Sequence, residues 1–331
     1  MTARTSPQAS PHPAAPATVG PGPSDSDRTA RIAFALLLTG ALSIALSPIF
    51  VRSVLSEIGP TAAAFWRPAL AIPVLWVWMA LEPRNPGAGK RVARRPSSAR
   101  DYGTLLLAGA FFAGDLIFWH LSIKYTSVAN STLLANVAPI YVALLSFLLF
   151  KERFSRVFVA GLALAVSGAV VLMGDSLSVG AGHLLGDSFG LITGLFYAAY
   201  ILTVGRLRAH FSTATIMTWS AIATSLMVLP VALLSGETLI PQTLFGWSMV
   251  LGLAIITHAG GQSLIAYALA HLPASFSSVS LLVQPVAAAV LAWIIFGEAL
   301  GPAQILGGAI VLGGISLARR GSSAKPTPPP T

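Results

Sequence analysis

The sequence predicts an all-α membrane protein, in which ten transmembrane helices form two inverted five-helix repeats around a central cavity. Three observations support this fold class. Of the 331 residues, 55% are hydrophobic and only 9% are charged, whereas about 25% of a typical soluble domain is charged. Ten apolar segments are each long enough to cross a bilayer as a helix. The two halves of the chain also share a register of Pro, Gly and Glu residues.

The apolar segments organise the chain. Each has close to the ~20 residues that a helix needs to cross the hydrocarbon core. The first repeat is expected at 31–173 and the second at 184–318. The flanking tails, 1–30 and 319–331, are rich in small residues and proline, so we expect them to be disordered and cytoplasmic. The predicted spans are 31–51, 61–81, 103–121, 128–150, 157–173, 184–205, 213–234, 246–270, 274–296 and 302–318.

Lys and Arg residues give the predicted orientation. With the N-terminus inside, 17 of the 20 lie on the inner side, and only Arg52 and Lys124 lie on the outer side. This asymmetry follows the positive-inside rule and predicts a multi-pass protein of the bacterial inner membrane with both termini cytoplasmic. The net charge of +9 therefore needs no nucleic-acid partner. The basic loop 82–102 is expected to meet anionic membrane lipid.

An ungapped internal repeat relates the two halves. Residues 126–172 align with 272–318 at an offset of 146 residues. Because each half has an odd number of spans, the second half enters the membrane from the opposite side. Inverted repeats of this kind give a transporter two related conformations around a central site. The aligned pairs are Pro139 with Pro285, Glu152 with Glu298, Gly161 with Gly307, and Gly168 with Gly314.

The segment from Ala266 to Leu317 contains a proline helix, a Gly297-Glu298 turn and a Gly-rich helix. It resembles the EamA domain of the drug/metabolite transporter superfamily. The first half matches more loosely, with a Lys151-Glu152 turn in place of Gly-Glu. The resemblance covers all but the tails. It implies a ten-helix secondary transporter, since members of this type include bacterial exporters of amino acids, aromatic ones among them, and of other metabolites.

Two charged residues within spans are the strongest candidates for a functional site, since each costs about 2.5–3.5 kcal/mol or more at the bilayer centre. Arg67 and Asp115 are each six residues from the outer end of their span, about 9 Å deep. Equal depth on consecutive antiparallel helices predicts an ion pair. The pair is interpreted either as a structural clamp or as a lining of the pathway that meets a zwitterionic or charged substrate. Asp115 is also a candidate to carry a proton.

Other polar residues lie near the middle of their spans. His258, with Gln262 one turn further on, is either a hydrogen-bonded packing residue or a substrate donor and protonation switch. Asn136 lies near Pro139 and Gln284 lies beside Pro285. Because proline removes a backbone donor and kinks a helix, these two prolines are predicted helix breaks beside a cavity, although a packing kink would give the same pattern.

Aromatic residues complete the predicted substrate-binding set. Tyr197 and Tyr200 lie on the face of their span opposite a stripe of small residues, and we expect them to face the interior. Trp119 is four residues after Asp115. It either lines an aromatic cavity suited to an apolar side chain or belongs to the aromatic belt at the membrane interface.

The inverted repeat predicts transport by alternating access, and the resemblance implies export of small metabolites, with amino acids as the expected substrates. Asp115 and His258 are the candidates for proton coupling. There is no H-E-x-x-H zinc motif and no cysteine, so we expect no catalytic residue, metal or cofactor. The alternatives are a passive facilitator, an intramembrane enzyme and a receptor. The oligomeric state stays open, with a monomer as one candidate.

Overall fold

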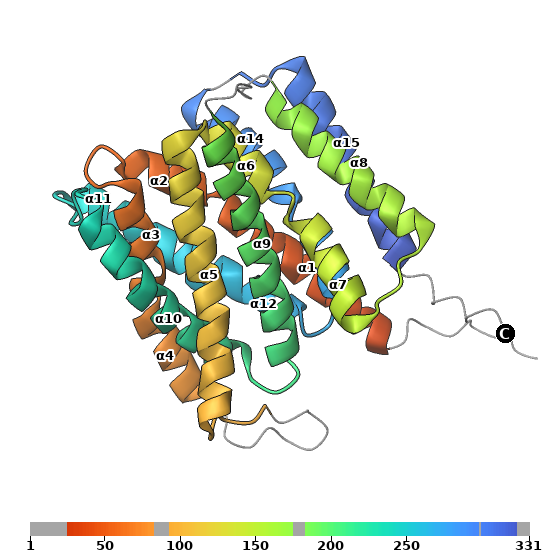
Figure 1. The fold of residues 1–331 in the computed structure, drawn as a ribbon, viewed down its shortest axis with the longest axis horizontal. Helices are drawn as coiled ribbons and strands as arrows, with labels where there is room; N and C mark the ends of the chain where they lie inside the picture. Colours follow the sequence, from red (N-terminus) through yellow and green to blue (C-terminus); the bar gives the residue numbers. More distant parts are fainter. Residues whose placement is uncertain (1–24, 83–92, 175–182, 298, 323–331) are drawn as a thin grey trace, which may run out of the picture.

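The structure, a computed structural model, describes residues 25–82, 93–174, 183–297 and 299–322. Within these ranges ten helical segments are long and apolar enough to cross a membrane, which confirms the predicted all-α, ten-span fold class. Figure 1 shows them as one bundle. The elements are α1 (Asp25–Ala45), α2 (Ser47–Val54), α3 (Pro60–Ala69), α4 (Ile72–Leu81), α5 (Ala99–Tyr125), α6 (Val128–Ala135), α7 (Ala138–Phe150), α8 (Arg156–Met173), α9 (Leu184–Leu207), α10 (Thr213–Leu234), α11 (Leu244–Gly252), the π-helix η3 (Leu253–Gln262), α12 (Ser263–Ala268), α13 (Ala274–Ser280), α14 (Val283–Phe296) and α15 (Pro302–Ser322).

The internal repeat is visible in the helix boundaries. α6 begins at Val128 and α13 at Ala274, which are 146 residues apart. The same offset relates the end of α7 to the end of α14, and the start of α8 to the start of α15. The register read from Pro, Gly and Glu therefore corresponds to equivalent helices in the two halves. Glu298, the predicted partner of Glu152, lies outside the described residues.

Four spans are broken near a proline. α2, α4 and α7 each carry Pro at one of their first two positions, and α14 carries Pro285 at its third. Proline fixes φ near −65° and has no N–H, so it fits the first turn of a helix and interrupts a helix interior. The breaks before Pro139 and Pro285 leave non-helical backbone near the middle of spans four and nine.

Three helices extend beyond the predicted spans into polar sequence. α1 begins at Asp25, inside the expected tail, and α15 continues past Arg319 to Ser322. α5 begins at Ala99 because Ser98 and Asp101 form a capping box, in which each side chain accepts a hydrogen bond from the backbone N–H of the other. Hydropathy measures apolar length, so it does not detect such polar first and last turns.

α8 and α15 pack side by side along one edge of the bundle (Figure 1). Glycine makes this approach possible. A Cβ at Gly161 would meet the backbone of Ala318, and a Cβ at Gly314 would meet the backbone of Ala165. Small residues allow this close backbone contact between membrane helices. The pair is displaced from the main buried cluster, to which α5, α9 and α10 contribute.

Candidate functional site

Arg67 of α3 and Asp115 of α5 lie in a polar and aromatic cluster within the main bundle. The guanidinium carbon of Arg67 is 5.7 Å from the ring centroid of Phe112. The charges of Arg67 and Asp115 interact, but among the described residues only Arg94 and Asp101 form an ion pair within 4 Å. The direct Arg67–Asp115 pair expected from equal depth is therefore not formed. Each charge keeps hydrogen-bonding capacity for another group.

The Arg67 side chain has an unusual environment. Its Nε atom is inaccessible to solvent and has no hydrogen-bond partner within the described part of the chain. A buried donor left without a partner costs about 1–3 kcal/mol, and more when charged. A carboxylate is the group that fits a guanidinium best, because it accepts two parallel N–H bonds. The cluster therefore has an unused hydrogen-bond donor that an anionic ligand group could accept from.

Two tyrosines of α9 extend the cluster. The ring centroids of Tyr197 and Tyr200 are 6.2 Å apart, and those of Tyr200 and Phe112 are 4.9 Å apart. Gln262 of η3 interacts with both tyrosine hydroxyl groups. The site thus combines aromatic faces with hydroxyl and amide groups, as small-molecule sites commonly do.

His258 of η3 is fully buried, at 0% exposure. Its ring centroid is 5.5 Å from that of Phe112. Neither ring nitrogen has a hydrogen-bond partner among the described residues, so the interpretation as a hydrogen-bonded packing histidine does not match this geometry. The helix that carries it is a π-helix. π-helical segments are rare and occur frequently at functional sites.

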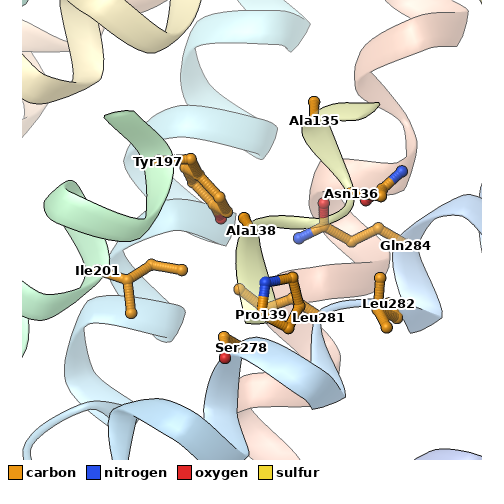
Figure 2. A pocket seen from close by; sticks show the side chains of 10 residues that line it. All are labelled: Ala135, Asn136, Ala138, Pro139, Tyr197, Ile201, Ser278, Leu281, Leu282 and Gln284. Atoms are coloured by element: carbon orange, nitrogen blue, oxygen red, sulfur yellow. The ribbon is translucent and has the colours of Figure 1, made fainter. Parts of the chain in front are cut away.

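A small cavity continues from this cluster to the breaks in spans four and nine. Asn136 and Pro139 line it from one half and Gln284 from the other, while Tyr197 joins it to the cluster. Figure 2 shows these side chains around the interrupted helix. The Nε2 atom of Gln284 is buried without a partner in the described structure. The cavity volume is about 20 Å³, enough for about one water molecule.

Of the nine predicted site residues, Trp119 is not part of this group. Its ring packs against His120, with centroids 5.1 Å apart. Sequence reasoning missed Phe112, which contacts Arg67, Tyr200 and His258. Its position three residues before Asp115, on the same helical face, could have identified it.

One sequence pattern in α9 matches an enzyme motif. Residues 186–190 read GDSFG, which fits the G-x-S-x-G pattern of a nucleophile elbow. That motif requires a strand–turn–helix, whereas here the whole segment is helical. The Ser188 hydroxyl donates to the carbonyl oxygen of Leu184 at 2.7 Å. The serine is therefore satisfied within its own helix and does not form an elbow.

Two carboxylates close one face of the bundle, which we call the Glu57 face. Glu57 accepts hydrogen bonds from the backbone N–H groups of Gln242 and Thr243, at 2.9 and 3.0 Å. Glu237 in turn accepts from the backbone N–H of Thr61 at 2.8 Å. Each carboxylate thus bonds the N-terminal region of a helix in the other half, where negative charge is favoured. The hydrogen bonds, above all that from the Thr243 hydroxyl, lower the pKa of Glu57 below its ordinary value.

The opposite face, where α1 begins, is closed by a basic residue. The backbone N–H of Arg94 donates to the carbonyl oxygen of His210 at 2.9 Å. The Arg94 guanidinium makes a bidentate pair with Asp101, at 2.5 and 2.6 Å, and the bond to Asp101 raises the pKa of Arg94. We call this the Arg94 face. Hydrogen bonds between the two halves are therefore present at both faces.

The fold has a solved counterpart. A crystal structure of a protein superimposes with a TM-score of 0.75, at 18% sequence identity, and the match covers 89% of this chain and 99% of that chain. An identity this low supports similarity of fold alone.

Named relatives are transporters. The threonine/homoserine exporter RhtA of Escherichia coli strain K12 is 32% identical over 222 residues, which are 66% of this chain and 70% of RhtA. The pseudopaline exporter CntI of Pseudomonas aeruginosa strain PAO1 is 25% identical over 288 residues, covering 83% and 94%. A probable terminal-alkyne amino-acid exporter of Streptantibioticus cattleyicolor is 27% identical over 239 residues, covering 70% and 78%.

The family comparison agrees with these relatives and with the ten-span bundle. The EamA-like transporter family matches twice, over residues 31–174 and 184–320. Together the two matches cover nearly all of the described helices. On these grounds, this multi-pass membrane protein belongs to the EamA-like transporter family.

Proposed function

We propose that the protein exports amino acids across the bacterial inner membrane by alternating access. The observation that carries the proposal is that Arg67 and Asp115, both half-buried, share one cluster without a direct ion pair between them. A cation and a carboxylate that are close but not directly paired match the carboxylate and ammonium groups of a zwitterion. The names of the relatives RhtA and CntI support export.

The other cluster residues have roles in this proposal. Tyr197, Tyr200 and Gln262 supply hydrogen bonds and fix the orientation of the substrate. Phe112 provides an aromatic wall beside Arg67. The cavity beside Asn136 and Gln284 would receive the substrate side chain once it expands. Asp115 and His258 remain the proposed coupling residues, because they are the titratable groups beside the bound substrate.

The proposed transport cycle follows from the contacts between the two halves at the two faces. In the proposed orientation the Arg94 face is cytoplasmic and the Glu57 face is periplasmic. Release of the Arg94 contacts would admit substrate, and release of the Glu57 and Glu237 contacts would discharge it. Such rocking of inverted repeats around a fixed site is the common mechanism of this architecture.

Counterflow into proteoliposomes tests the proposal. Vesicles preloaded with one unlabelled compound are assayed for uptake of the same labelled compound across a panel of amino acids, nucleobases and sugars. We expect uptake with amino acids, threonine and homoserine included, and none with nucleobases or sugars. Uptake of sugars or nucleobases with none of any amino acid would overturn the proposed substrate class. An imposed pH gradient then separates coupled from passive transport, since only a coupled carrier accumulates substrate against its gradient.

A further inference from the structure

A second pocket lies at the Arg94 face, where α1 begins and α15 ends. Its volume is about 350 Å³, within the range of small-ligand pockets. Arg31, His271 and Arg319 line it from three separate segments of the chain. Among the described residues that line it, none is acidic. The pocket is therefore basic, and it is distinct from the Arg67–Asp115 cluster.

The pocket also has an aromatic part. The rings of Phe34 and Phe276 stack with centroids 5.6 Å apart, and the guanidinium of Arg319 lies 4.3 Å from the Phe34 centroid. Leu272 and Pro273 add further apolar lining. Cations beside an apolar surface match a molecule that joins a phosphate to hydrocarbon.

The positive charge of the pocket comes from its two arginines, Arg31 and Arg319. Partial burial lowers the pKa of His271, and the positive charge of Arg208 lowers it further, which favours the neutral imidazole. One carboxylate bonded to this region is Glu152, which accepts a hydrogen bond from the Ser275 hydroxyl at 2.9 Å. Glu152 does not line the pocket.

We infer that this pocket binds the phosphate head group of an anionic phospholipid. It lies at the ends of two membrane spans, Arg28–Val54 and Pro302–Ser322, the depth at which lipid phosphates occur. A phosphodiester accepts hydrogen bonds from Arg31 and Arg319, and the acyl chains follow the apolar flanks of α1 and α15. The site concerns lipid binding to the carrier and goes beyond the transported substrate.

Native mass spectrometry of the purified full chain tests this inference. The protein is titrated with phosphatidylglycerol and, separately, with phosphatidylcholine, and the bound lipids are counted. Each Lys or Arg near a membrane surface contributes about fivefold to the affinity for anionic lipid. Arg31→Gln with Arg319→Gln should therefore weaken phosphatidylglycerol binding roughly 25-fold. The matched control is Arg153→Gln with Arg156→Gln, two exposed basic residues predicted on the same face but outside the pocket.

The outcomes separate the sources of binding. Loss of the phosphatidylglycerol preference in the pocket variant, with retention in the control, supports the inference. Equal weakening in both basic variants would mean diffuse surface charge and would overturn the inference. Displacement of the lipid by millimolar inorganic phosphate would indicate a soluble anion as the ligand and would overturn it as well. Unaltered binding in a pocket variant with an unchanged melting temperature would have the same consequence.

Discussion

Lys151 and Gly297 occupy equivalent positions 146 residues apart, and both end a helix in the left-handed backbone conformation. Their φ angles are 55° and 68°, at the C-caps of α7 and α14. Glycine adopts this conformation freely, whereas a residue with a Cβ is strained there by roughly 1–2 kcal/mol. The two repeats thus share one turn geometry, and the first repeat keeps it at a cost.

This strain predicts the effect of exchanging the two residues. Lys151→Gly should stabilise the fold by about 0.5–1 kcal/mol, since relief of strain outweighs the extra freedom of the unfolded chain. Gly297→Ala should destabilise it by a similar amount. Thermal unfolding in detergent, monitored by circular dichroism, compares the variants. A lower melting temperature for Lys151→Gly would show that the lysine side chain contributes more than its backbone costs.

Adjacent glycines of α15 provide a test of the α8–α15 packing. A Cβ at Gly314 would meet the backbone of Ala165, whereas a Cβ at Gly313 has open space. Gly314→Ala should therefore destabilise the protein by about 1–3 kcal/mol through overpacking. Gly313→Ala should be neutral or slightly stabilising, because alanine favours helix. Equal melting temperatures of the two variants would contradict the close approach of the helices.

The proposed zwitterion site predicts a specific pattern of transport loss. Arg67→Gln and Asp115→Asn each remove one charge-assisted contact to the substrate, so affinity should fall roughly 10- to 100-fold. Arg100→Gln, at an exposed position of α5, serves as the control and should transport normally. Substrate affinity is measured by counterflow at varied substrate concentrations. If both site variants kept the affinity of the unaltered chain, the cluster would not be the substrate site.

His258 permits a separation of coupling from binding. His258→Gln keeps a hydrogen-bonding side chain but cannot be protonated near neutral pH. We expect this variant to catalyse counterflow yet fail to accumulate substrate under an imposed pH gradient. The pH-gradient arm is the decisive one, because counterflow alone requires no coupling. Normal accumulation in His258→Gln would remove His258 from the proton path and leave Asp115.

Glu57 predicts a pH dependence of the contacts at its face. A carboxylate whose pKa is lowered by folding stabilises the folded contact at pH values above its ordinary pKa. That contribution is lost as the pH falls through the lowered pKa. Acid should therefore release Glu57 from Gln242 and Thr243. In hydrogen–deuterium exchange corrected for intrinsic rates, these two amides should exchange faster at pH 4 or below than at pH 7. Glu57→Gln should show fast exchange at both pH values, while Glu82→Gln should match the unaltered chain.

Much of the fold could be predicted because a membrane restricts the folds that a chain can adopt. The spacing of apolar stretches gave ten helices, and the offset from Pro139 to Pro285 located equivalent breaks. The polar ends of α1, α5 and α15 were missed, since capping and helix length depend on specific hydrogen bonds. The π-helical form of η3 was also not predicted, because the hydrophobic period of a short segment does not distinguish it from an α-helix.

Most residues of the site could be predicted from the sequence, but their spatial arrangement could not. Burying a charge or histidine in lipid is costly, so Arg67, Asp115 and His258 could be selected from the sequence alone. Depth along a helix does not determine the direction in which a side chain points. For that reason the expected direct pair between Arg67 and Asp115 is absent from the described structure. Phe112 was missed because an aromatic residue in an apolar helix is common, and only its position on the helical face of Asp115 distinguishes it.

Cross-linking each face in turn tests alternating access most directly, because the chain contains no cysteine of its own. Glu57→Cys with Thr243→Cys places a thiol pair across the Glu57 face, and Arg94→Cys with His210→Cys places one across the opposite face. A short, cleavable thiol cross-linker is applied to each pair in proteoliposomes, with the single-cysteine variants as controls. Either cross-link should stop substrate exchange, and cleavage of the cross-linker should restore it. Continued exchange with one face fully cross-linked would contradict a carrier whose central site opens to each side in turn.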